Sequence, residues 1–174
     1  MNRAVIEPAG PKIATFRPDM IISGGQSGAD FGALLGAADC GIPTGGVAPK
    51  GWRTEIGPKP ELGSVFGLTE SESENYNVRT RENIVICDIV VLVAHDFDSP
   101  GSYTTAELAR KYGKPLFPVV FPRLPSLEWP YLIADLVAWL DFHRAGIINF
   151  AGNRESRARG IEQWTEKLVI ELFS

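Results

Sequence analysis

The chain has few of the residues that build metal centres, disulfide scaffolds or catalytic dyads. Among its 174 residues there are only two cysteines and two histidines. Cys40 and Cys87 are far apart and each lies in an apolar stretch, while His95 and His143 have no ligand-type neighbours at metal-binding spacing. The sequence therefore predicts free buried thiols, a reducing compartment and no metal site built from protein side chains.

The chain also lacks long hydrophobic runs and a strong excess of charge of either sign. No apolar stretch approaches the ~20 residues that a membrane span needs. Residues 1–19 contain three prolines and no continuous apolar core of the kind found in signal peptides. A net charge of −4 provides no basic face for duplex nucleic acid. We therefore expect a cytoplasmic protein that binds neither membranes nor nucleic acid.

What the sequence does contain is an alternation of short apolar strands and helices. We expect strands at residues 20–22, 65–68, 89–93, 116–120 and 147–150, and helices at residues 29–39, 79–87, 105–112, 132–140 and 159–173. Residues 44–64 are rich in glycine and proline, which predicts a loop with at most a short strand near Val47. This alternation predicts an α/β fold, a Rossmann-like three-layer sandwich with a central, mainly parallel sheet and helices on both faces. Residues 20–174 would form this single domain behind an N-terminal extension, residues 1–19.

A glycine-rich loop, Ser23-Gly24-Gly25-Gln26-Ser27-Gly28, follows the first expected strand and precedes a helix. Glycines let the backbone approach an anion closely, and a helix N-terminus adds unpaired N–H groups. We expect this loop to bind a phosphate, with the Ser27 hydroxyl as a donor and Asp30 holding a ribose hydroxyl. The alternative is a tight strand-to-helix turn. The spacing matches neither a Walker loop nor a dinucleotide-binding fingerprint.

Later loops carry cations and hydroxyl groups, and the carboxyl ends of parallel strands meet at one edge of the sheet. Arginine and lysine pair with phosphate oxygens, and the start of a helix attracts anions. A solvated surface loop around Lys50, and N-capping by Ser102 or Thr104, are the alternative interpretations. The candidate phosphate ligands in these loops are Lys50, Gly51, Arg53, Arg79, Gly101, Ser102, Thr104, Thr105 and Arg154.

Several of these motifs together resemble the molybdenum carrier family. They are Ser23-Gly-Gly-Gln-Ser-Gly-Ala-Asp30, Gly46-Val-Ala-Pro-Lys-Gly51, Arg79-Thr80 with Asn83 and Asp88, and Asn149-Phe-Ala-Gly-Asn-Arg-Glu-Ser156. The resemblance is colinear from about residue 20 to the C-terminus. It implies a Rossmann-like fold, a homo-oligomer (dimer or tetramer), and molybdenum cofactor as bound cargo. That cofactor is a pterin with a phosphate and a molybdenum–dithiolene head, which a carrier stores or delivers without transforming it.

A second, more distant resemblance points to catalysis. The segment Pro100-Gly-Ser-Tyr-Thr-Thr-Ala-Glu107 resembles the Pro-Gly-Gly-x-Gly-Thr-x-x-Glu motif of cytokinin-activating phosphoribohydrolases. This implies hydrolysis of the N-glycosidic bond of nucleoside monophosphates, with Glu107 as the catalytic residue and Arg79 assisting it. Ser102 and Thr104 replace two glycines of the motif. Two functions therefore stay open: a binding protein for a phosphate-bearing, nucleotide-like ligand, and a phosphoribohydrolase.

Overall fold

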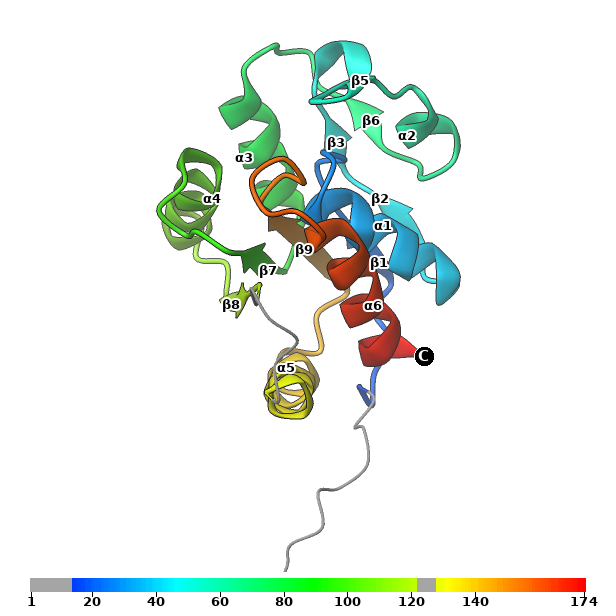
Figure 1. Ribbon diagram of the computed structural model, residues 1–174, viewed down its shortest axis with the longest axis vertical. Helices are drawn as coiled ribbons and strands as arrows, with labels where there is room; N and C mark the ends of the chain where they lie inside the picture. Colours follow the sequence, from blue (N-terminus) through cyan, green and yellow to red (C-terminus); the bar gives the residue numbers. More distant parts are fainter. Residues whose placement is uncertain (1–13, 122–127) are drawn as a thin grey trace, which may run out of the picture.

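A parallel sheet between two layers of helices forms the body of the molecule (Figure 1). The computed structural model describes residues 14–121 and 128–174. The sheet has the strand order β2-β1-β9-β7-β8 and consists of β1 (Met20–Ile22), β2 (Thr44–Gly45), β7 (Ile89–Ala94), β8 (Leu116–Val120) and β9 (Ile147–Gly152). One face packs against α1 (Ala29–Asp39), α5 (Trp129–His143) and α6 (Ile161–Phe173), and the other against α3 (Tyr76–Ile86) and α4 (Pro100–Lys111). The predicted Rossmann-like α/β class is confirmed.

The two faces of the sheet bury alternate side chains of the same strands. All six residues of β7 are buried, as the unbroken apolar run predicts for a central parallel strand. Val91 and Val93 pack with Leu136 in the core under α1, α5 and α6. Val90 instead packs with Ile84 in the smaller core under α3 and α4. The same two helices, α3 and α4, flank the cavity described below.

The strand order is a circular permutation of the doubly wound Rossmann order. Counted from β9 as the first strand, through β1, β2, β7 and β8, the sheet runs 3-2-1-4-5. The permutation needs chain ends that lie close together, and the Ala14 amide donates to the Leu172 carbonyl at 2.9 Å. Figure 1 likewise shows the C-terminus beside the start of the described chain. The topological switch point therefore lies between β9 and β7.

A small lobe occupies the stretch that the sequence predicts to be loop. It contains β3 (Val47–Ala48), η1 (Lys50–Trp52), β4 (Arg53–Thr54), β5 (Gly57–Pro58), α2 (Glu61–Ser64) and β6 (Thr69–Glu70). Ala48, Leu62 and Leu68 pack with Leu34 of α1 in a core of their own. The strand expected at residues 65–68 is wrong, since Val65 caps α2 and the strand follows at Thr69–Glu70. Two-residue strands are too short to produce a readable periodicity.

The other element boundaries shift for local reasons. Helix α4 begins at Pro100, five residues before the expected start, because proline fits the first turn of a helix. Helix α3 begins at Tyr76, where the Asn75 side chain accepts the Asn77 amide at 2.9 Å. Of the N-terminal extension, residues 14–19 are described, and the Thr15 amide donates to Asp141 Oδ1 at 2.8 Å. No helix in the described ranges is long and apolar enough to cross a membrane.

Candidate functional site

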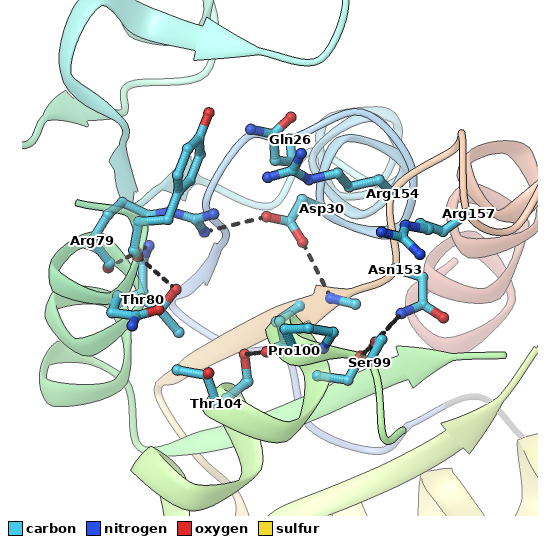
Figure 2. A pocket seen from close by; sticks show the side chains of 18 of the residues that line it. Gln26, Asp30, Arg79, Thr80, Ser99, Pro100, Thr104, Asn153, Arg154 and Arg157 are labelled. Atoms are coloured by element: carbon cyan, nitrogen blue, oxygen red, sulfur yellow. Dashed lines mark hydrogen bonds and ion pairs between the residues drawn. The ribbon is translucent and has the colours of Figure 1, made fainter. Parts of the chain in front are cut away.

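A cavity of about 280 Å³ opens at the carboxyl ends of β7 and β9, between α3 and α4 (Figure 2). This is the switch point of the sheet, where doubly wound folds bind their ligands. Three groups of residues line it. The loop after β1 contributes Gln26, and the first turn of α1 contributes Asp30. Helix α3 contributes Tyr76, Asn77, Arg79, Thr80 and Asn83. The start of α4, strand β9 and the loop after β9 contribute Ser99, Pro100, Gly101, Ser102, Thr104, Thr105, Asn149, Ala151, Gly152, Asn153, Arg154 and Arg157.

A buried ion pair forms one wall of the cavity. Asp30 Oδ2 lies 3.5 Å from Arg79 Nη1, and the two side chains are 6% and 11% exposed. Burial raises the pKa of Asp30, and the Arg79 charge opposes this rise together with backbone amides of Gln26, Gly152 and Gly24. Burial in turn lowers the pKa of Arg79, which the Asp30 charge opposes. The cavity wall thus contains a buried carboxylate and a buried guanidinium that lie side by side.

The glycine-rich loop wraps around this carboxylate. A Cβ on Gly24 would overlap the Arg79 guanidinium and would lie 2.8 Å from Asp30 Oδ2. Other amides of the loop are also used within the chain, because Gly25 N donates to Ser23 Oγ at 3.1 Å and Gly28 N donates to Glu162 Oε2 at 2.9 Å. The amides of Gly24 and Gln26 interact with the Asp30 carboxylate instead, so the loop amides serve groups of the chain itself. Of the candidates here, Gln26 and Asp30 line the cavity, whereas Gly24, Gly25, Ser27 and Gly28 do not.

The first turn of α4 forms the opposite wall. All four candidates from this segment, Gly101, Ser102, Thr104 and Thr105, line the cavity. A Cβ built on Gly101 would meet no atom within 4 Å, so the start of the helix faces open space. The Asn153 side chain shapes this wall, donating to the hydroxyls of Ser99 and Ser102 at 3.0 Å each and accepting the His95 amide at 2.8 Å. The start of α4 is thus the accessible helix N-terminus of this cavity.

Arginines surround the mouth of the cavity. The described lining contains three arginines, Arg79, Arg154 and Arg157, and one carboxylate, that of Asp30, which pairs with Arg79. The Arg154 guanidinium carbon lies 5.2 Å from the centre of the Tyr76 ring, and that of Arg53 lies 6.0 Å from it. Arg53 contacts the site through this ring and does not line the cavity. Of the other expected ligands, Lys50 and Gly51 belong to η1 in the small lobe and do not line it either.

Glu107 lies outside the cavity, on the exposed side of α4. Its side chain is 44% exposed and pairs with Arg110 at 2.9 Å, an interaction that lowers the pKa of Glu107. Counted from Pro100, the last residue of the phosphoribohydrolase motif falls on Leu108, which packs against the apolar core under α4. The acid that the sequence suggests for catalysis is therefore not beside the cavity.

Sequence reasoning missed several residues that the fold brings to the cavity. Asn153 and Arg157 lie in the loop after β9, from which the sequence indicated only Arg154 as a ligand. Tyr76 and Thr80 lie on the first turns of α3, where the sequence drew attention to the arginines. Asn149 begins a motif that carries the family resemblance, but its place inside a strand gave no indication that it lines a cavity. Asn149 lies at the cavity because β9 is inserted between β1 and β7 in the sheet.

The described part of the chain holds no group of three or more His, Cys, Asp or Glu side chains that could bind a metal. Neither thiol changes this picture. Cys87 is buried, and burial raises the pKa of its thiol to about 11, which disfavours the thiolate that a soft metal needs. Cys40 is a partly buried free cysteine at the end of α1, on the other side of the sheet from α3 and α4.

Comparison with known proteins places the chain in a family. The model of the circularly permutated YpsA SLOG family matches residues 21–173. The chain is also similar to a crystal structure from Syntrophus aciditrophicus SB, of a protein named "Putative molybdenum carrier protein". The two sequences are 34% identical, the TM-score is 0.80, and the match covers 90% of this chain and 96% of the other. No curated protein matches. The resemblance to the molybdenum carrier family seen in the sequence is thereby confirmed.

Proposed function

Because the chain belongs to the circularly permutated YpsA SLOG family, we propose that it binds a small phosphate-bearing, nucleotide-like ligand in the cavity between α3 and α4. One observation carries this proposal. The first turn of a 12-residue helix and the side chains of Arg154 and Arg157 meet at one mouth, with Arg79 deeper in the same cavity. Unpaired helix N–H groups and guanidinium groups are the donors that proteins direct at phosphate oxygens.

The size of the cavity limits the ligand. A volume of about 280 Å³ lies at the lower end of the range of small-molecule pockets, about 300–1,000 Å³. It suits one mononucleotide or a pterin phosphate better than a dinucleotide. The structural neighbour is named a molybdenum carrier, which is consistent with molybdenum cofactor as the cargo. In that case the arginines and α4 would hold the phosphate, and the dithiolene of the cofactor would keep the metal. We also propose that the protein is a dimer or tetramer that stores or delivers this ligand.

The alternative function, a phosphoribohydrolase, requires an acid beside the sugar of the ligand. Asp30 lines the cavity and burial raises its pKa, whereas Glu107 lies outside. The candidate catalytic role therefore passes from Glu107 to Asp30, with Arg79 beside it. Incubation with AMP followed by chromatography tests this. Free adenine formed by the wild type and by Glu107→Gln, but not by Asp30→Asn, would support hydrolysis by Asp30. Intact AMP would support binding without turnover.

Binding itself is tested by mass spectrometry and calorimetry. Native mass spectrometry of freshly purified protein should reveal a bound phosphorylated small molecule. In titrations with AMP and with inorganic phosphate, Arg154→Ala and Arg157→Ala should each weaken binding about 10-fold or more, the size expected for a charged hydrogen bond. Arg110→Ala, which removes an exposed arginine from the far side of α4, is the matched control and should leave the affinity unchanged. A wild-type protein that carries no such molecule and binds neither probe would overturn the proposal.

A further inference from the structure

Asn149 has a buried polar atom that nothing in the described chain satisfies. The residue is 2% exposed, lines the cavity, and its Oδ1 has no hydrogen-bond partner among the described residues. Native proteins leave few buried polar groups unpaired, because the desolvated group loses its hydrogen bond to water. An unpaired acceptor on the wall of a ligand cavity therefore points to a donor supplied by the ligand.

Three polar neighbours in the cavity wall, Asn83, Thr80 and Thr105, are already engaged within the chain, whereas Arg79 Nε is a second buried atom without a partner in the described chain. Asn83 uses both ends of its amide on Val47, accepting the backbone N–H at 2.8 Å and donating to the carbonyl at 3.0 Å. The hydroxyls of Thr80 and Thr105 donate to carbonyls one helical turn back, those of Tyr76 and Gly101, at 2.9 Å each. These donors are committed to backbone structure, which leaves the Asn149 oxygen to the ligand.

The position of Asn149 on β9 sets the distance to the phosphate end of the cavity. Asn149 pairs with Ile22 and Val90 in the body of the sheet, and Gly152 is the last residue of the strand. With a rise of about 3.3 Å per residue, Asn149 lies ~10 Å before the strand end, where Arg154 and the start of α4 are found. A ligand anchored by phosphate at the strand end would reach Asn149 with its opposite end.

We propose that Asn149 is the specificity-determining residue of this cavity, whose Oδ1 accepts a hydrogen bond from an amino or ring N–H group of a heterocycle carried by the phosphorylated ligand. The proposal rests on the proposed function, because it takes the phosphate to lie at the mouth. Purine nucleotides and pterin phosphates share this chemistry, whereas plain sugar phosphates do not. A cavity with an unpaired buried acceptor rejects ligands that lack the donor, since the acceptor then stays unsatisfied.

Calorimetric titration of the wild type and Asn149→Ala tests this. AMP, GMP and neopterin monophosphate carry N–H donors on a heterocycle; purine riboside 5′-monophosphate lacks the amino group of AMP, and ribose 5-phosphate lacks the heterocycle. The wild type should bind at least one donor-bearing probe about 10-fold more tightly than ribose 5-phosphate. Asn149→Ala should abolish that preference and leave the affinity for ribose 5-phosphate unchanged. The preferred probe distinguishes a nucleotide site from a pterin site.

Thr165→Val is the matched control, because Thr165 Oγ1 is also buried and without a partner in the described chain but belongs to α6, away from the cavity. It should bind every probe as the wild type does. Equal affinity of wild type and Asn149→Ala for the donor-bearing probes would overturn the inference while leaving phosphate binding intact. If Asn149→Ala does not fold, equal wild-type affinity for all the phosphorylated probes would overturn it as well. Failure of every probe to bind the wild type would overturn the proposed function, and this inference with it.

Discussion

At Gly24 the absence of a side chain decides where the Arg79 guanidinium lies. Arg79 packs against the Gly24 backbone, and from there it reaches the Asp30 carboxylate. Removing one partner of a buried ion pair is costly because it leaves an uncompensated buried charge. Displacing one partner by a methyl group has a similar effect at smaller scale. The glycine thus supports the ion pair that forms the cavity wall.

Gly24→Ala should therefore lower both stability and affinity. The added methyl group must displace Arg79, and overpacking of this kind typically costs about 1–3 kcal/mol. Urea unfolding measures the stability, and titration with AMP measures the affinity. Gly101→Ala is the control for stability, because its Cβ would meet nothing within 4 Å and alanine suits a helix better than glycine. Equal stability of Gly24→Ala and the wild type would show that Arg79 does not depend on this contact.

How far the sequence reveals the site depends on the residue. The glycine-rich loop predicts a bound anion, and in the structure two of its amides interact with a carboxylate of the chain itself, that of Asp30; phosphate binding by the loop stays a prediction. The motif around Gly101 and Thr105 correctly marks a helix start at a cavity. Asn149 could not be found, because the pattern of a buried strand says nothing about which neighbours leave an amide unpaired. Recognisable motifs thus identified Asp30, Arg79 and Thr105, which line the cavity, but also residues such as Lys50, which do not.

At the scale of elements, the side chain of Glu55 connects the β4–β5 hairpin to two loops beside the cavity. Glu55, in the turn between β4 and β5, accepts the Ser156 amide at 3.1 Å and the hydroxyls of Ser27 and Ser156. Its own amide donates to Gln26 Oε1 at 3.1 Å. Partial burial alone would raise the pKa of Glu55, but the bonds from Ser156 and Ser27 outweigh it and hold the pKa below its ordinary value of 4.5. The carboxylate thus joins the small lobe to two loops beside the cavity.

Glu55→Gln should weaken this connection in a pH-dependent way. A carboxyl whose pKa is lower in the folded than in the unfolded state stabilises the protein above the unfolded pKa. That stabilisation is lost as the pH falls below about 4.5. At pH 7 we expect the variant to be less stable by about 1 kcal/mol or less, since the group is partly exposed to solvent. The difference should shrink as the pH falls through 4.5, as thermal unfolding at several pH values would show.

The exposed Glu61 of the same lobe provides the control, because Glu61→Gln should not reproduce this pH dependence. A Glu55→Gln difference in stability that stays constant from pH 7 to pH 4 would contradict the role given to the charge.

The sequence predicts the long helices and the apolar strands because each repeats a periodic pattern. It does not predict the hairpin, because two-residue strands are too short to show a periodic pattern. Glu55 moreover acts through contacts that are distant in the sequence: Ser27 is 28 residues from it and Ser156 is 101 residues from it.

At the scale of the whole molecule, the permuted order explains why the ends of β7 and β9 form the site. The sheet keeps the Rossmann arrangement in space, with the switch point between the first and fourth strands, although the chain begins elsewhere. The alternation of elements predicts the layers and the parallel sheet. It does not predict the strand order, because the same alternation fits several orders, and packing of α6 beside α1 selects among them. The permutation should therefore be reversible without loss of the site.

A chain that starts at Ala145, runs to Ser174 and continues through a linker into residues 14–144 would restore the unpermuted order. Because Ala14 N already lies 2.9 Å from the Leu172 carbonyl, a linker of about 4–6 glycine and serine residues spans the gap. The new ends fall between α5 and β9, away from α3 and α4, the two helices that flank the cavity. We expect cooperative thermal unfolding and an affinity for AMP within about threefold of the wild type.

A second permutant, opened between Asp98 and Ser99, serves as the opposite case. It uses the same linker but cuts the connection from β7 to α4, so the first turn of α4 loses the position fixed by the hydrogen bonds between Asn153, Ser99 and Ser102. Its AMP affinity should fall at least as far as that of Arg154→Ala, while far-ultraviolet circular dichroism still reports a folded protein. Equal binding by the two permutants would mean that the junction of β7 and α4 does not hold the ligand, and the phosphate would then have to bind elsewhere along the sheet edge.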